Sequence, residues 1–224
     1  MASANVAQWI SSNIQHVGKD VLELGSKRYK EHAFLDLPGL LAEHGGQVSL
    51  TGCDISEGEN VDVVVDLTAP IERVKAALED RTFDTIFCVS LLEHIPDVFS
   101  ACRNIEQLLR PGGAIYLSVP FVFRYHGYPG DLWRFTPEAL LYLFPGIDFR
   151  DHEYSCISTL EDGDIMALKG KNMDKLNRFL FRPKSREEKI ERKRAKSEGK
   201  RVPAYSLAPA MINMLGFRKQ ELPL

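Results

Sequence analysis

Residues 83–97, FDTIFCVSLLEHIPD, and residues 108–120, LLRPGGAIYLSVP, decide the fold of this chain. Each stretch contains a short apolar run that predicts a buried strand, at Phe83–Val89 and at Ala114–Val119. The intervening residues, Val98–Leu109, have helical spacing, with Asp97 placed to cap the start of the helix, and lead into a Pro-Gly-Gly turn that stops it. Strand, helix and strand at this spacing predict a βαβ unit with two parallel strands.

The same alternation continues toward both ends of the chain. The candidate elements before the quoted stretch are strands at Asp20–Leu24, Val48–Cys53 and Val61–Val65 and helices at 6–17, Pro38–His44 and Ile71–Leu78. After it, Thr136-Pro137 opens another helix, and candidate strands at Glu153–Ser158 and Asp164–Leu168 lie too close together for a parallel crossover. We therefore expect an α/β fold with a mostly parallel seven-stranded sheet, an antiparallel last strand and helices on both faces.

The bulk composition fits one globular core in a reducing compartment. A chain of 224 residues with 44% hydrophobic content can bury one substantial core. The cysteines, at positions 53, 88, 102 and 156, show no C-x-x-C spacing, which indicates reduced thiols rather than a disulfide framework. No apolar run is long enough for a transmembrane helix, and the first residues lack a signal-peptide pattern, so we expect a cytoplasmic protein.

Polar residues follow four of the predicted strands, at the edge of the sheet where ligands bind in open α/β folds. They are Gly25, Asp54, Asp66 and the segment Ser90–His94. Each has a structural alternative when taken alone: an ordinary turn at Gly25, a loop or capping carboxylate at Asp54 and Asp66, and a packed histidine at His94. Four such strand ends at one edge predict a binding site.

These strand ends resemble the class I S-adenosylmethionine-dependent methyltransferases. The resemblance covers roughly residues 18–168 and rests on VLELGS (21–26), GCDIS (52–56), VVVDL (63–67) and the two stretches quoted first. It implies a Rossmann-like fold, S-adenosylmethionine as the cofactor and methyl transfer as the reaction. The part of that family that acts on small molecules is the most similar.

The resemblance also implies where the cofactor lies. Its methionine part would contact Glu23, Gly25 and Ser26, and its ribose would contact Asp54 and Ile55. Its adenine would lie beside Asp66 and Leu67, and its sulfonium near Ser90 and Leu91. The sequence departs from the family's glycine-rich loop, because Lys27 and Tyr29 stand at its second and third glycine positions. A dinucleotide needs those glycines to cradle a pyrophosphate, whereas S-adenosylmethionine has no phosphate, so a nicotinamide cofactor is the weaker interpretation.

The loop Val119–Thr136, rich in aromatic residues, predicts the wall of a substrate pocket. We expect His126, or else His94, to act as general base on the acceptor, because the imidazole pKa lies near working pH. The substrate would contact Tyr125, Asp131, Trp133 and Arg134. A structural alternative is that Asp131 and Arg134 merely tie the loop down. No spacing of ligands in the sequence indicates a metal site. The loop also resembles methyltransferases linked with bacterial surface-sugar biosynthesis, which makes a sugar the favoured acceptor.

The last part of the chain is predicted to form a basic extension, 169–224, after a methyltransferase domain at 1–168. Residues 169–201 carry 14 Lys or Arg against 5 Asp or Glu. Its most biased segment, Lys184–Arg201, is either a solvated face or a contact for nucleic acid or another anionic surface, and Tyr205–Leu224 is a candidate lid. Three functions remain open: a small-molecule methyltransferase, which we favour, an RNA methyltransferase, and a non-catalytic binding module with this fold.

Overall fold

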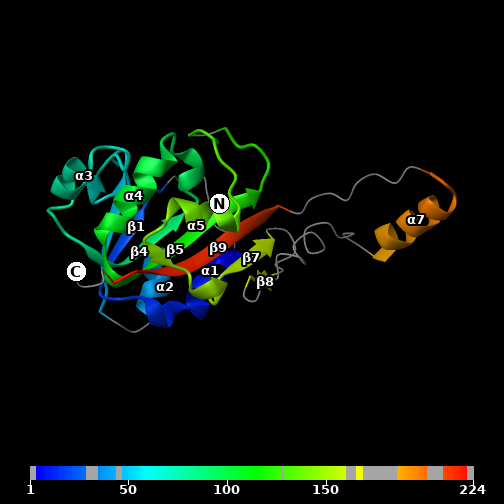
Figure 1. Cartoon of the computed structure of the whole chain (residues 1–224), viewed down its shortest axis with the longest axis horizontal. Helices are drawn as coiled ribbons and strands as arrows, with labels where there is room; N and C mark the ends of the chain where they lie inside the picture. The colour runs from blue at the N-terminus through cyan, green and yellow to red at the C-terminus, as the bar shows by residue number, and fades with distance from the viewer. Residues whose placement is uncertain are drawn as a thin grey trace.

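The computed structural model describes residues 4–28, 35–43, 47–127, 129–159, 165–168, 186–200 and 209–220. These residues form one sheet with helices on both faces (Figure 1). The strands are β1 Asp20–Leu24, β2 Ser49–Asp54, β3 Val63–Val64, β4 Phe83–Val89, β5 Leu109–Val122, β6 Ile147–Asp148, β7 Cys156–Thr159, β8 Ile165–Ala167 and β9 Ala210–Arg218. Their order is β3-β2-β1-β4-β5-β9-β7-β8, with β6 paired to β9.

The strand directions confirm the predicted fold class and show where the antiparallel strand lies. Neighbours from β3 to β5 are parallel, whereas β9 pairs antiparallel with both β5 and β7. The sheet of the described residues has 9 strands rather than the expected seven. The expected division at residue 168 does not follow this sheet, because β9 comes from 210–218, within the segment predicted as a lid. Its run AMINMLGFR is buried over Ala210–Gly216 on both faces, so it lacks the alternation that marks a half-exposed strand.

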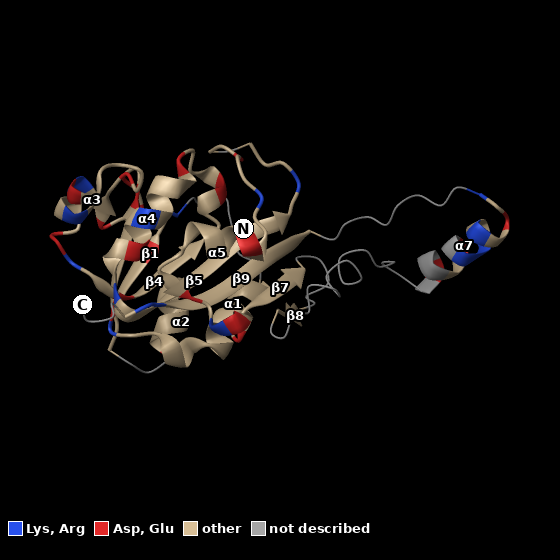
Figure 2. Cartoon of the chain, viewed as in Figure 1, with Lys and Arg blue, Asp and Glu red and all other residues tan. Residues whose placement is uncertain are grey.

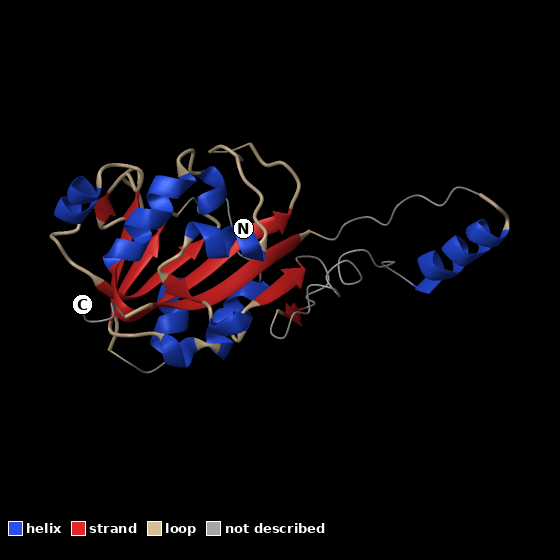
Figure 3. Cartoon of the chain, in the orientation of Figure 1, coloured by secondary structure: helices blue, strands red, loops and turns tan. Residues whose placement is uncertain are grey.

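The helices are α1 Ala4–Ser12, α2 Leu37–Glu43, α3 Ile71–Ala77, α4 Val98–Leu108, α5 Pro137–Leu143 and α7 Arg186–Ser197, with short 3-10 turns at Ile14–His16, Leu92–His94 and Arg150–His152. Five of the helices, α1 to α5, divide between the two faces of the sheet, and α7 lies apart from it (Figure 3). One buried cluster joins α3, α4 and α5 to the sheet, and a second joins α1 and α2 to the opposite face. Alternate strand residues supply the two clusters: Tyr116 packs in the second and Leu117 in the first.

Two predicted caps are present. The Asp97 carboxylate accepts a hydrogen bond from the backbone N–H of Ser100 at the start of α4, and the Thr136 hydroxyl accepts one from Ala139 N–H at the start of α5. Each side chain satisfies a backbone donor that has no partner within its helix. The sequence therefore fixes where these two helices begin.

Helix α7 carries the basic bias of the sequence. Its described side chains at Lys193, Arg194 and Lys196 are exposed, and Figure 2 shows the blue of Lys and Arg along this helix. Arg194 and Lys200 both pair with Glu198. Within the described part of the chain, no helix is both long and apolar enough to span a membrane.

An ion cluster joins the starts of β1, β4 and β5. One Asp84 oxygen accepts the backbone N–H groups of Lys19 and Asp20, at 3.1 and 3.0 Å. The other accepts from Arg110, at 2.6 Å, and Arg110 also contacts the Asp20 carboxylate. Burial alone would raise the pKa of Asp84, but the Asp20 N–H and the Arg110 guanidinium outweigh it and lower this pKa.

Asp84→Asn tests this cluster through pH. Because the pKa of Asp84 is lower in the folded protein, its stabilisation is complete above the unfolded pKa, about 4, and is lost as pH falls through the folded value. We expect the variant to lose about 1–2 kcal/mol of unfolding free energy above pH 5, and the difference from the unsubstituted protein to shrink below pH 4. Urea unfolding between pH 3 and 7 measures it, with exposed Glu72→Gln as the control. A difference that stays constant with pH would contradict the role given to the charge.

Candidate active site

A cavity of about 1080 Å³ opens at the carboxyl ends of β1, β2 and β4. Its size suits a small-molecule ligand. The predicted site residues that line it are Glu23, Gly25, Asp54, Ile55, Asp66, Leu67, Ser90, Leu91, His94 and His126. Those outside its lining are Ser26, Tyr125, Asp131, Trp133 and Arg134. The structure thus brings the strand-end residues together at one site, as the sequence indicates.

The turn after β1 depends on Gly25. Its φ of +69° lies in the left-handed region, and a Cβ there would meet Leu91 at 3.0 Å. The N–H groups of Gly25 and Ser26 both donate to the Cys53 carbonyl, at 2.8 and 3.0 Å. Ser26 is fully buried and its hydroxyl donates to the Asn60 carbonyl, so it holds the turn instead of facing the cavity.

The loop after β1 lacks the further glycines of the family pattern, and contacts with the loop after β2 stabilise it instead. Lys27, at the second glycine position of the resemblance, donates from Nζ to the Ser56 hydroxyl at 2.9 Å. The two loops approach so closely that a Cβ on Gly58 would lie 2.8 Å from Lys27 Cε. Tyr29, at the third glycine position, lies outside the described residues. The non-standard loop is therefore ordered at Lys27 by side-chain contacts.

Asp54 and Asp66 present carboxylates at the cavity in the same way. In each, one oxygen accepts the N–H and the hydroxyl two residues on: Ser56 for Asp54, and Thr68 for Asp66. Among the described residues, the second oxygen of each has no hydrogen-bond partner. Each side chain is thus oriented by its turn and keeps an acceptor for a ligand.

Two other strand ends carry buried polar groups. Glu23 is 7% exposed and pairs with Arg28 at 2.9 Å; burial raises its pKa although Arg28 lowers it. Ser90 has a φ of +50°, which strains a residue with a side chain. Its hydroxyl is buried and, within the part of the chain that the structure describes, has no hydrogen-bond partner. An unpaired buried hydroxyl beside a cavity is a candidate ligand contact.

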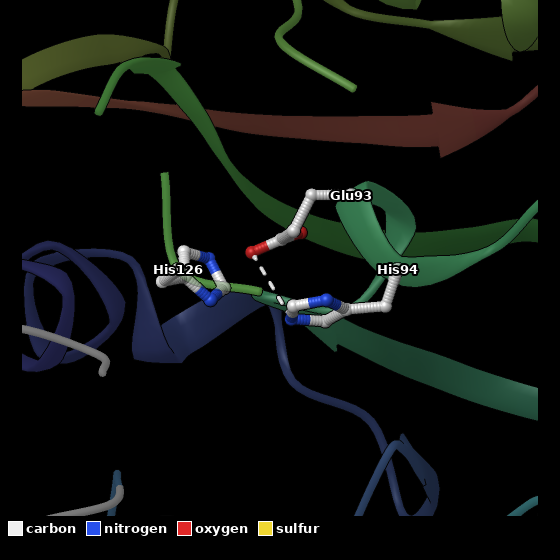
Figure 4. Close-up of side chains that lie close together, drawn as sticks. All are labelled: Glu93, His94 and His126. Atoms are coloured by element: carbon white, nitrogen blue, oxygen red, sulfur yellow. Dashed lines mark ion pairs between the residues drawn. The ribbon is translucent and has the colours of Figure 1, made fainter. Parts of the chain in front are cut away.

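Glu93, His94 and His126 converge at one end of the cavity (Figure 4). Glu93 Oε1 lies 3.9 Å from His94 Nε2, and the centroids of the two imidazole rings lie 5.1 Å apart. His94 Nδ1 is hydrogen-bonded to the Gly130 carbonyl. Because a carbonyl only accepts, Nδ1 carries the proton and Nε2 of the neutral ring keeps its lone pair toward the cluster.

Glu93 lies within the predicted segment Ser90–His94, but the sequence indicates no role for it. Its side chain is 3% exposed, and burial raises its pKa to about 7; burial also lowers the pKa of His94. One Glu93 oxygen is buried with no hydrogen-bond partner among the described residues. The available signal was a charged residue beside His94 in the otherwise apolar run LLEHIP, where a surface carboxylate is the default expectation.

The loop after β5 divides into a part at the cavity and a part that holds the loop down. Tyr125 is 76% exposed, and Trp133 packs against the core and donates from Nε1 to the Ile95 carbonyl. The Asp131 side chain is buried and binds the Arg134 guanidinium through both oxygens, one of them at 2.7 Å. Asp131 also accepts the backbone N–H of His126. These contacts fit the structural alternative for Asp131 and Arg134; Tyr128 lies outside the described residues.

Comparison with known proteins gives matches along the chain. The family described as "Methyltransferase domain" matches residues 37–117. "Ubiquinone biosynthesis O-methyltransferase" of Pseudomonas aeruginosa strain LESB58 is 30% identical over 121 residues, which cover 49% of this chain and 48% of that protein. The protein of the same name from Stutzerimonas stutzeri is 29% identical over 119 residues. The match spans about half the length of these relatives.

Solved structures match over nearly the whole chain. A SAM-dependent methyltransferase from Archaeoglobus fulgidus matches with a TM-score of 0.53 at 16% identity, covering 95% of this chain and 93% of that one. YcgJ from Bacillus subtilis matches with a TM-score of 0.52 at 13% identity, covering 96% and 98%. The [4+2]-cyclase SpnF matches at 0.51 and 14%, covering 96% and 79%. At these identities the likeness shows the fold.

The fold and the strand ends at one edge of the sheet are similar to those of S-adenosylmethionine-dependent methyltransferases. The match to the methyltransferase-domain family covers residues 37–117, and over this part the chain is similar to that family. S-adenosylmethionine is accordingly the cofactor that these similarities support. The reaction and the acceptor are a separate question, because one fold serves many reactions.

The variant Arg134→Met tests whether Arg134 stabilises the loop by pairing with Asp131 or contacts the substrate. Removing the guanidinium leaves the buried Asp131 carboxylate unpaired, so we expect the unfolding free energy to fall by about 3 kcal/mol. Adding Asp131→Asn to this variant should restore part of the loss, because the uncompensated charge is gone. Urea denaturation of the two variants measures both effects. Unchanged stability with a raised KM for the acceptor would instead favour a substrate contact.

Proposed function

We propose that this protein transfers the methyl group of S-adenosylmethionine to a hydroxyl group of a small molecule. The proposal rests on one observation: a single cavity holds the nucleoside-type acceptors Asp54 and Asp66 together with the polar cluster Glu93, His94 and His126. The two carboxylates suit a bound cofactor, and the polar cluster suits the group that accepts the methyl. An amine acceptor is an alternative of the same class.

The residues at the strand ends fit S-adenosylmethionine. A carboxylate with an unused oxygen, such as that of Asp54, accepts hydrogen bonds from ribose hydroxyls, and Asp66 would accept from an adenine amino group. Ser90, whose buried hydroxyl has no hydrogen-bond partner among the described residues, lines the same cavity. The cofactor has no phosphate, so the single glycine turn at Gly25 meets its needs.

When bound, the cofactor supplies an activated methyl group on a positively charged sulfur. The chain then has to position the acceptor and accommodate the proton that its hydroxyl loses. His126 and His94 are the proposed groups at the acceptor, and the Asp131–Arg134 pair holds the loop that carries His126. Positioning by a fixed loop is the main contribution of the protein to such a displacement.

The matched relatives and the residues that line the cavity both support a small-molecule acceptor with a hydroxyl group. The relatives' printed name is that of an O-methyltransferase, which supports an oxygen acceptor. We favour a polyhydroxy acceptor such as a sugar, because Arg124 and the Glu93–His94–His126 cluster offer polar contacts at this end of the cavity. Among the described residues of the loop, Phe123 lines the cavity with a phenyl ring, whereas the predicted Tyr125 and Trp133 do not.

We further propose that α7 binds an anionic partner, because the side chains of Lys193, Arg194 and Lys196 are exposed. If the methyl acceptor were a nucleic acid instead of a small molecule, its phosphates would contact this helix. The exposed ends of these side chains suit phosphates, but they do not line the cavity described above. We therefore keep the small molecule as the favoured acceptor.

Asp54→Ala tests the cofactor half of this proposal. Calorimetric titration with S-adenosylhomocysteine should show one site on the unsubstituted protein and about tenfold or weaker affinity in the variant, because hydrogen bonds to a charged acceptor are lost. Exposed Glu57→Ala, on the same loop, is the matched control and should bind as the unsubstituted protein does. Equal affinity of Asp54→Ala and the unsubstituted protein for S-adenosylhomocysteine, or no binding to the unsubstituted protein, would contradict the proposal.

A further inference from the structure

Glu93, His94 and His126 each offer one ligand atom at the acceptor end of the cavity, and these atoms all lie within 4.8 Å of one another. Glu93 and His94 come from the turn after β4, whereas His126 comes from the loop after β5 (Figure 4). Two segments far apart in the sequence thus place two imidazoles and one carboxylate around one point. We call these three side chains the Glu–His–His cluster.

We propose that the Glu–His–His cluster binds one divalent first-row transition-metal ion, with Zn²⁺ as the representative ion, and that the ion holds the oxygen of the acceptor. Two imidazoles and a carboxylate are a common ligand set for such ions, and three protein ligands leave coordination positions open for a substrate. The inference rests on the proposed function for the identity of the acceptor, but not for the binding of the metal.

The spacing of the cluster suits a small ion. On a tetrahedral ion with ligand bonds of about 2.0–2.2 Å, two ligand atoms lie about 3.3–3.6 Å apart. Glu93 Oε1 and His94 Nε2, at 3.9 Å, are slightly wider apart than this. All three ligand atoms lie within 4.8 Å of one another. A small inward movement of the His126 loop would complete the site.

The surroundings of the cluster orient its ligands as metal sites require. The Gly130 carbonyl takes the Nδ1 proton of His94, which directs the lone pair of Nε2 to the cluster. Asp131 fixes the backbone of His126, and Arg134 in turn holds Asp131.

The Glu93 carboxylate gives a second, independent indication. Its side chain is 3% exposed, and its Oε2 atom is buried without a hydrogen-bond partner among the described residues. Burying an unpaired carboxylate is costly, whereas a cation bound to it removes that cost. The structure therefore contains an acceptor group whose natural partner is a positive charge within the cavity.

A bound ion would change the acceptor and leave the stoichiometry of methyl transfer intact. Coordination lowers the pKa of the acceptor hydroxyl, whose proton passes to solvent. The oxygen electron pair then forms the new C–O bond to the methyl carbon, and the electron pair of the broken C–S bond stays on sulfur. The products are the methyl ether, S-adenosylhomocysteine and one proton, with no oxidant or reductant. The histidines are then ligands in place of bases.

Metal titration of the full chain, after treatment with a chelator and its removal, tests the proposal. We expect Zn²⁺ to bind at one ion per chain by calorimetry, with the same ratio by elemental analysis. Glu93→Gln and His126→Ala should each weaken binding at least about tenfold, because losing even the outer partners of a ligand costs about 10–100-fold. His152→Ala, a histidine outside the cluster, is the matched control and should leave the affinity unchanged.

A second readout keeps the test independent of activity and folding. Co²⁺ added to the metal-free protein should give visible absorption bands of a low-coordinate site, and these bands should be lost in Glu93→Gln, whose fold is checked by circular dichroism. Absence of stoichiometric binding, or binding that the cluster variants leave unchanged, overturns the metal site. If S-adenosylhomocysteine still binds in that case, the proposed function stands and the histidines act as bases; if it does not bind, the proposed function fails separately.

Discussion

The pairing of β9 with β5 is the constraint on which the site depends. The two strands are paired from Ala114 opposite Phe217 to Val122 opposite Ala210, along most of β5. Inside the sheet, Asn213 joins them through the Ser118 hydroxyl at 2.8 Å and reaches β7 through Ser158 at 2.9 Å. The segment with His126 begins directly after β5, so the position of that histidine over the cavity depends on a strand from the last part of the chain.

Burial then sets the chemistry of the acceptor end. Glu93 lies at the end of β4 in an apolar turn, which raises its pKa to about 7 and leaves one oxygen unpaired. Hydrophobic packing between β4 and α4 holds this turn, because Leu92 packs in the same buried cluster as Val98. A carboxylate that costs free energy in the folded state is a feature of sites that receive a ligand, since nothing in the packing itself requires it.

The sequence was sufficient where local physics decides the structure. Phe83–Val89 forms the predicted strand to the residue, the caps at Asp97 and Thr136 form as expected, and the strand ends meet at one edge. The sequence was insufficient where partners come from far along the chain. β9 shows no alternation because both its faces are buried, and Glu93 resembles any surface carboxylate until the folded chain buries it. For Asp131 and Arg134 the sequence left two interpretations open, a substrate contact or a pair that holds the loop, and the loop geometry shows the pair.

A crystal structure of the protein grown with S-adenosylhomocysteine tests the central claim most directly. We expect the nucleoside to lie in the cavity, with its ribose hydroxyls on Asp54, its adenine beside Asp66 and Leu67, and its sulfur toward Glu93, His94 and His126. The product bound elsewhere on the sheet, or bound in the cavity with its sulfur pointing away from that cluster, would contradict it.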